Sequence, residues 1–171
     1  MKKTVSRAFA IILAFLFVFQ ASFVAFADDE PDWQDIVLTA EEFNEILAQN
    51  PNNSASTCAS GLILTYAIAI GGKVSSGSAK LVIAGETYCA PDVNKCGFTV
   101  VTIKRRTSSL SSWTTYKTYE DLYNDRPDYI LSKTITVPSG YQWRVYCTHY
   151  AKKSILSKEK IDNYSNVVAI G

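Results

Sequence analysis

The chain has 171 residues with one histidine and four cysteines, and its 17 Lys and Arg nearly balance its 16 Asp and Glu. A net charge of +1 with no dense basic stripe excludes proteins that bind nucleic acid through many phosphate contacts. The length suits one domain with a short extension. No strong catalytic, metal or nucleotide motif is present, so no cofactor and no metal site are expected.

The first 27 residues predict a secretory signal peptide. Lys2, Lys3 and Arg7 give a positive start, an apolar run extends from Ala8 to Phe19, and Ala25-Phe26-Ala27 supplies small residues before a cleavage site. Cleavage after Ala27 would release residues 28–171 into an oxidising compartment. The alternative is that this segment stays uncleaved and anchors the chain in the membrane. Membrane contact is expected only in that case. The acidic flank and the break in the apolar run at Gln20 favour cleavage.

Residues 28–60 form an acidic extension, with eight acids and no Lys or Arg between positions 28 and 50. Thr39 and Glu42 have the spacing of a capping box, and an apolar stripe at helical spacing follows it. A short helix over about 40–49 is therefore expected. So short a helix is marginal alone in water. It is interpreted as a linker with nascent helix, a pro-segment or a partner-binding helix.

From residue 61 to 171 the apolar period changes to two. The pattern predicts strands with turn residues between them, and no long helix. Regular short strands of this kind indicate an all-β sandwich or barrel. Seven strands are expected, over Leu62–Ile70, Lys80–Cys89, Gly97–Arg106, Trp113–Tyr119, Tyr129–Val137, Tyr141–Tyr150 and Ser165–Ile170.

The stretch from Val137 to Val145 resembles the corner between strands E and F of fibronectin type III domains, with Tyr141 as the corner tyrosine. The resemblance implies a seven-stranded antiparallel sandwich of immunoglobulin or fibronectin III type, with strands A, B, C, C′, E, F and G in chain order.

A second resemblance covers roughly residues 61–170. The motifs that carry it are Lys80-Leu81-x-Ile83, Lys95-x-Gly97-Phe98, Ile103-x-Arg105, Ser112-Trp113-Thr114, Tyr141-x-x-Arg144-Val145-x-Cys147-Thr148-His149-Tyr150-Ala151-Lys152 and Ser165-Asn166. In these motifs the chain is similar to a family of small secreted proteins of Gram-positive bacteria that is known only as a domain of unknown function. The resemblance implies export and fold, and no activity.

The four cysteines allow three pairings. Cys89 and Cys96 flank a short connection between two predicted strands, so their pairing is favoured, and it leaves Cys58 with Cys147. The rival is Cys89 with Cys147, similar to the bridge between the sheets of immunoglobulin domains. A zinc site is the further alternative, but secretion favours disulfides.

His149 is the one residue on which a hydrolase of the Ser-His-Asp type would depend, yet no G-x-S-x-G elbow is present. An ordinary sheet residue is the favoured interpretation. Asp121, Asp125 and Asp128 lie in an acidic segment without EF-hand spacing, which favours a solvated loop over a calcium site. The basic run Lys104–Arg106 is expected to cap a sheet edge.

The aromatic residues Trp113, Tyr116, Tyr119 and Tyr123 cluster on and after one predicted strand. Exposed rings of this kind suit contact with a sugar or a partner protein, whereas packing over the core is the structural alternative. The sequence therefore predicts a secreted or envelope-associated, non-enzymatic module that binds an unknown protein or glycan at the cell surface. The alternatives are a secreted hydrolase that uses His149 and a structural envelope or matrix protein.

Overall fold

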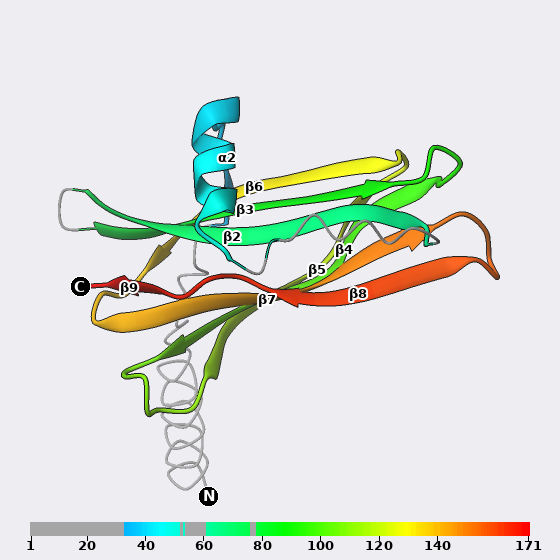
Figure 1. Cartoon of the computed structure of the whole chain (residues 1–171). Helices are drawn as coiled ribbons and strands as arrows, with labels where there is room; N and C mark the ends of the chain where they lie inside the picture. The colour runs from blue at the N-terminus through cyan, green and yellow to red at the C-terminus, as the bar shows by residue number, and fades with distance from the viewer. Residues whose placement is uncertain (1–32, 52, 54–60, 76–77) are drawn as a thin grey trace, which may run out of the picture. The chain divides into compact units, whose positions relative to one another are not determined.

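The computed structural model describes residues 33–51, 53, 61–75 and 78–171. The predicted signal peptide and Cys58 lie outside these residues. Most of the described part of the chain is in antiparallel strands that form two sheets, with one short helix (Figure 1). The prediction of an all-β sandwich is confirmed at this level.

The first sheet has the strand order β1-β6-β3-β2, and the second has the order β5-β4-β7-β8, with β9 paired to β7. The strand bounds in chain order are β1 Gln34–Asp35, β2 Ile63–Ser75, β3 Ser78–Cys89, β4 Lys95–Arg106, β5 Thr114–Asn124, β6 Asp128–Val137, β7 Tyr141–Lys152, β8 Lys158–Tyr164 and β9 Val168–Ile170.

The main core lies between the two sheets. On β7 the predicted alternation holds, because Trp143, Val145 and Cys147 are buried while Arg144 and Tyr146 are half-buried on the other side. Leu81 and Ile83 of β3 are fully buried against this core. A shift of one residue would exchange these faces, so the burial pattern fixes the register.

The strands differ from the prediction at the two ends of the chain. β8 was not predicted, because its sequence Lys-Glu-Lys-Ile-Asp-Asn-Tyr has Ile161 as its single aliphatic residue. The expected last strand over 165–170 begins only at Val168. β1 forms in the acidic extension, where no strand was expected, and its Gln34 pairs with Thr134 of β6.

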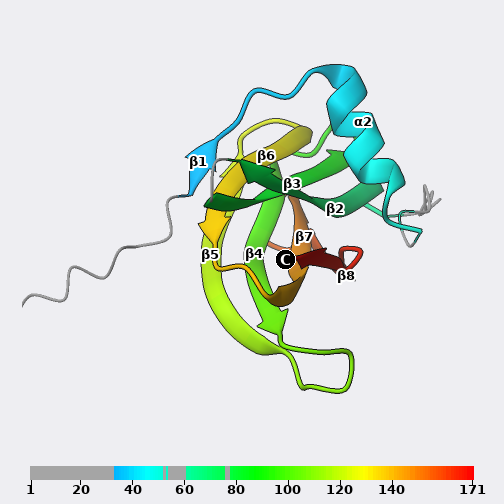
Figure 2. The ribbon, with the colours of Figure 1, turned by 90° about the vertical axis from the view of Figure 1, so that its left-hand side faces the viewer.

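The predicted helix exists as α2, Ala40–Ala48, and both hydrogen bonds of the Thr39–Glu42 capping box are present. Figure 2 shows α2 against the outer side of β2 and β3. Its Ile46 side chain lies directly over Gly71 of β2. Because α2 shields this side, Val82 and Ala84 on the outer face of β3 are buried as well. The helix is therefore docked on the sandwich and is not a free linker.

Side chains bond to the backbone along the outer edge of β2. Asn50 donates to the Ile68 carbonyl at 2.6 Å, and Asn53 accepts from the Ile68 amide at 3.1 Å. Asn166 bonds both backbone groups of Ile70, at 2.9 Å each. The Glu159 carboxylate accepts from the amides of Leu62 and Ile63. These contacts satisfy backbone groups that a neighbouring strand would otherwise bond.

Candidate functional site

The four aromatic residues predicted as a binding surface lie in different surroundings. Tyr116 packs edge-on against the core residue Trp143, with ring centroids 5.1 Å apart and planes at 81°. Tyr119 stacks on Trp33 at 3.8 Å. Both tyrosines are half-buried against the main core. They therefore contribute to packing at the open side of the sandwich.

Trp113 and Tyr123 lie away from that core cluster and far apart, because Trp113 directly precedes β5 and Tyr123 is near its end. Trp113 is contacted by the guanidinium groups of Arg106 and Arg144, at 4.4 and 5.4 Å from the ring centroid. Tyr123 lies beside Tyr150, with the Lys95 ammonium 4.4 Å from its ring. The structure thus does not bring the four predicted residues together into one patch.

Trp113 instead belongs to a row of rings and cations on the outer face of the second sheet. The Arg144 guanidinium lies 5.0 Å from the Tyr164 ring, the Tyr164 and Tyr146 rings are 6.1 Å apart, and the Lys104 ammonium lies 4.7 Å from the Tyr146 ring. We call this set the aromatic–cation row; it consists of Arg106, Trp113, Arg144, Tyr164, Tyr146 and Lys104.

Strand register assembles this row. Lys104 of β4 is directly opposite Arg144 of β7, and Tyr146 is directly opposite Tyr164 of β8. Because alternate residues of a strand share a face, the burial of Trp143 and Val145 turns Arg144 and Tyr146 outward. Arg105, in contrast, lies on the inner side against the Tyr116 and Tyr141 rings.

Part of this row could be predicted from the sequence. The alternation of β7 already assigns Arg144 and Tyr146 to the solvent side, but no residue pattern paired them with Lys104. The run Lys104–Arg106 was expected only to cap a sheet edge. That expectation did not foresee that Lys104 and Arg106 lie beside aromatic rings. Tyr164 was missed because β8 was not predicted.

The row is strongly basic. Within the described part of the chain, Lys104, Arg106 and Arg144 form no ion pair with a carboxylate. The Arg106 Nε donates to Gln142 at 2.9 Å, and the buried Nε of Arg144 has no hydrogen-bond partner. Like charges directly opposite each other, as in Lys104 and Arg144, destabilise a sheet. The arrangement therefore leaves positive charge available for an acidic ligand.

His149 points into the interior and is 0% exposed. Its Nδ1 lies 2.7 Å from the Thr87 hydroxyl, and its Nε2 lies 3.5 Å from the Cys147 sulfur. Burial lowers the pKa of His149 to about 3, so the imidazole is neutral at pH 7. Since a general base must reach its substrate, this position does not suit a hydrolase.

Cys89 and Cys96 face each other, with their sulfur atoms 2.9 Å apart and not bonded. The Cys96 thiol donates to the Thr87 carbonyl, and hydrogen bonding to Cys89 together with burial raises the pKa of the Cys96 thiol. Cys147 is buried beside His149, and burial raises the pKa of its thiol. Its expected partner Cys58 lies outside the described residues.

The three acids of the predicted solvated loop do not converge. Asp128 forms an ion pair with Arg126 at 2.7 Å, Asp125 lies 3.9 Å from Lys95, and Asp121 accepts from the Tyr123 hydroxyl. Across the described residues, no three His, Cys, Asp or Glu side chains come together in a way that would hold a metal ion.

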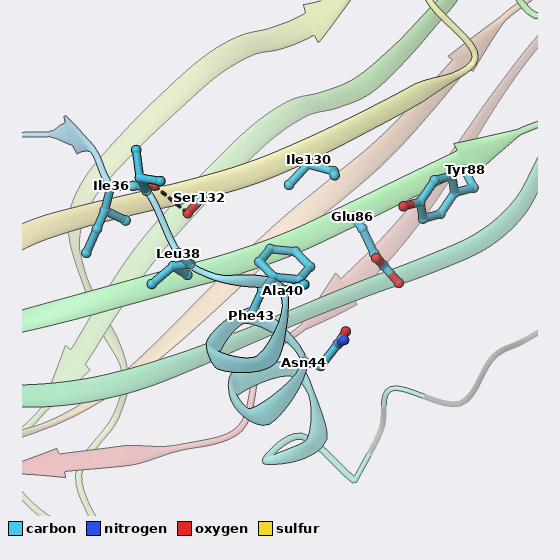
Figure 3. A pocket seen from close by; sticks show the side chains of 10 residues that line it. Ile36, Leu38, Ala40, Phe43, Asn44, Glu86, Tyr88, Ile130 and Ser132 are labelled. Carbon is cyan, nitrogen blue, oxygen red and sulfur yellow. Dashed lines mark hydrogen bonds between the residues drawn. The ribbon is translucent and has the colours of Figure 1, made fainter.

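A groove of about 430 Å³ lies between α2, the segment before it and the outer face of the first sheet. Figure 3 shows Phe43 of α2 and Glu86 and Tyr88 of β3 around this space, with the Ser132 hydroxyl bonded to the Ile36 carbonyl at 2.8 Å. Desolvation raises the pKa of Glu86. The groove is thus largely apolar with one acidic group, opposite in charge to the aromatic–cation row.

In the part of the chain that the structure describes, no helix has the length and apolar character needed to span a bilayer. No family model, no curated protein and no solved structure matches this chain.

Proposed function

We propose that this protein is an extracellular binding module that recognises an acidic glycan through the aromatic–cation row. Export follows from the signal peptide predicted over residues 1–27, and an acidic polymer of the cell surface is the partner. The recognition surface differs from the predicted aromatic cluster, because it keeps Trp113 but not Tyr116 and Tyr119, which pack against the main core, nor the distant Tyr123. Residues of β4, β7 and β8 take their place.

The observation that carries this proposal is the set of three cations without acidic partners in the described residues. Aromatic rings lie within 5.4 Å of the charged groups of Lys104, Arg106 and Arg144 and limit their movement. Guanidinium groups bind carboxylates through paired hydrogen bonds. Cations that are already positioned lose less side-chain entropy when a ligand binds. The row is therefore suited to a ligand with repeated negative charges.

Polar neighbours favour a glycan over a protein partner. Thr102 pairs with Tyr146 across the strands, and Thr118 and Thr148 carry further hydroxyls on the same sheet. Protein interfaces depend on a few apolar anchors buried in pockets. The strongly exposed side chains of Val37, Ile155 and Leu156 lie elsewhere, and Leu110 stands alone in the loop between Arg106 and Trp113. Hydroxyls and flat rings match the mixed polar and apolar surface of a sugar.

The buried position of His149 supports binding over the alternative of a hydrolase. The imidazole contacts Thr87 and Cys147 in the core, and its fully buried ring offers no access for a substrate. A structural envelope or matrix protein is the remaining alternative, and it would show no discrete ligand.

The strand order supports a finer assignment of the fold. With β2, β3 and β6 as strands A, B and E, and β4, β5, β7 and β8 as C, C′, F and G, one sheet is A-B-E with the two-residue β1 beside E, and the other is C′-C-F-G. In a constant-type immunoglobulin sandwich the strand beside E is D, which follows C in the chain. Because β1 precedes strand A in the chain, it is not strand D, and the order supports a fibronectin III-like sandwich.

Calorimetric titration with polygalacturonate oligosaccharides tests the function, with neutral dextran and poly-glutamate of similar length as comparison ligands. Arg144→Ala and Lys104→Ala should each weaken binding of polygalacturonate roughly tenfold, because a hydrogen bond to a charged group is worth about 1.5–3 kcal/mol. Lys73→Ala, which removes an exposed cation of β2, is the matched control and should bind as the wild type does.

Three outcomes would contradict the proposal. Equal weakening by Lys73→Ala would indicate unspecific attraction by charge. Equal affinity for poly-glutamate would indicate an acidic protein partner. No binding of any probe would favour a structural role.

A further inference from the structure

The turn between β7 and β8 exposes two adjacent apolar side chains. Ile155 is 80% exposed and Leu156 is 96% exposed. The turn is closed by hydrogen bonds, because the Ser157 carbonyl accepts from the amides of Lys153 and Ser154, and the Ser157 amide donates to the Ser154 hydroxyl. We call residues 153–157 the hairpin tip. Its backbone is fixed in a shape that holds both apolar side chains in solvent.

Lysines surround this tip on both strands of the hairpin. Lys152 and Lys153 precede the two apolar residues, and Lys158 and Lys160 follow them. Lys153 pairs with Asp92. The other three form no ion pair within the described residues, and Glu159 between them is bonded to the amides of β2. The tip therefore combines an apolar end with a positive collar.

A second turn of the molecule shows that exposure of a single leucine is not enough. Leu110, between β4 and β5, is 96% exposed, but its flanking residues are serines. Isolated apolar side chains are common on protein surfaces. The hairpin tip differs because two such residues are adjacent and are framed by cations.

We propose that the hairpin tip inserts into the surface of an anionic lipid bilayer. Ile155 and Leu156 enter the boundary between headgroups and acyl chains, where apolar side chains are stabilised. The lysine stems extend along the hairpin so that the ammonium groups meet lipid phosphates. This contact goes beyond binding by the aromatic–cation row and does not depend on it, because it uses the end of the hairpin and not the face of the sheet.

Depth-dependent quenching tests the insertion. Leu156→Trp and Leu110→Trp are prepared in the full chain and mixed with vesicles of equal parts phosphatidylglycerol and phosphatidylcholine that carry brominated acyl chains. The added indole of Leu156→Trp should be quenched and that of Leu110→Trp should not, each relative to the wild type. The comparison holds whether or not residues 1–27 remain attached, because it contrasts two positions of one chain.

Vesicle affinity gives the second readout. Ile155→Ser combined with Leu156→Ser should weaken binding to the anionic vesicles at least roughly tenfold, since each buried aliphatic side chain contributes appreciably to transfer from water. Lys158→Gln and Lys160→Gln should each weaken it about fivefold, the effect of about 1 kcal/mol per lysine near an anionic surface. Leu110→Ser is the control and should change nothing. All these side chains are exposed, so folding should be unaffected.

Several results would overturn the inference. Equal quenching at both positions, or none at either, would mean that the tip does not insert selectively. Unchanged affinity of the double serine variant would assign vesicle binding to another segment, such as the apolar run at 8–19. Equal quenching of Leu156→Trp by vesicles of phosphatidylcholine alone would show that the lysines do not contribute to insertion.

Discussion

At the scale of single residues, His149 shows how a side chain associated with catalysis serves the interior of a sandwich. Its ring lies 4.6 Å from Phe98 and 5.1 Å from Tyr66 by centroid distance, and its Nδ1 is bonded to Thr87. The core accepts this imidazole because the Thr87 hydroxyl satisfies a ring nitrogen, and burial keeps the ring neutral. The residue thereby makes stability depend on pH.

We expect the free energy of unfolding to fall as pH decreases from about 6.5 towards 3. The folded-state pKa of His149 is about 3, whereas an unfolded histidine titrates near 6.5. Between these values the unfolded chain binds one more proton, which lowers stability by about 1.4 kcal/mol per pH unit from this group alone. Urea unfolding at several pH values measures the slope.

His149→Gln is the control for this slope, because glutamine retains hydrogen bonding to Thr87 but does not titrate. The difference between the slopes of wild type and variant, in free energy of unfolding per pH unit, should correspond to the uptake of one proton on unfolding. Glu86, whose raised pKa gives the opposite sign, is common to both proteins and cancels. Parallel slopes in the two proteins would show that the imidazole is accessible to protons in the folded state.

At the scale of elements, the pairing of β4 with β5 depends on a close approach at Gly97. This residue has a φ of +150°, and a Cβ atom there would lie 2.3 Å from the Leu122 carbonyl oxygen of β5. Glycine is required for both reasons, since it lacks a Cβ and tolerates positive φ. The contact lies where Gly97 is directly opposite Tyr123 in the β4–β5 register.

Gly97→Ala should lower the free energy of unfolding by roughly 2–3 kcal/mol, the range of overpacking in a tight site. Gly140→Ala is the matched control. Gly140 also has a positive φ, +81°, but no atom lies within 4 Å of its added Cβ. Gly140→Ala should lower the free energy of unfolding by about 1 kcal/mol, from backbone strain alone. Chemical denaturation of both variants provides the comparison, and equal losses would refute the steric explanation.

The elements also show how far sequence patterns reach. Alternation predicted the buried side of β7, and the capping box predicted α2 to within a residue at its end. β8 was not predicted because its sequence lacks apolar alternation. The strand forms through its pairing with β7 and the packing of Ile161. The aromatic–cation row was not predicted for a related reason. Its residues come together only through the register between strands that are distant in sequence. The partial burial of Tyr116 and Tyr119 was not predictable from the sequence either. It arises because Trp143 and Trp33, which are distant in the chain, pack against these two rings.

At the scale of the whole molecule, the proposed export fixes the redox state in which the protein works. Cys89 and Cys96 are side by side as free thiols. We propose that they form a disulfide in the oxidising compartment, where two thiols lose two electrons and two protons to a thiol oxidase or a small disulfide. Closing this short loop should stabilise the fold by about 2.5 kcal/mol in the chain-entropy model.

Peptide mapping by mass spectrometry tests this pairing. Protein recovered from the culture medium should yield a peptide pair linked through Cys89 and Cys96, and reduction should lower its melting temperature. Cys89→Ser with Cys96→Ser should show the lower value without reduction. Alkylation of both thiols in material from the medium would contradict the pairing, and a link from Cys89 to Cys147 would support the rival arrangement.

The side-chain bonds along β2 have a consequence for the association of two copies of this protein. An outermost strand with unsatisfied amides and carbonyls is a template on which a second molecule extends the sheet. Here Asn50, Asn53 and Asn166 occupy the backbone groups of Ile68 and Ile70 that such growth would use. The molecule thus blocks intermolecular strand addition along this stretch of its border.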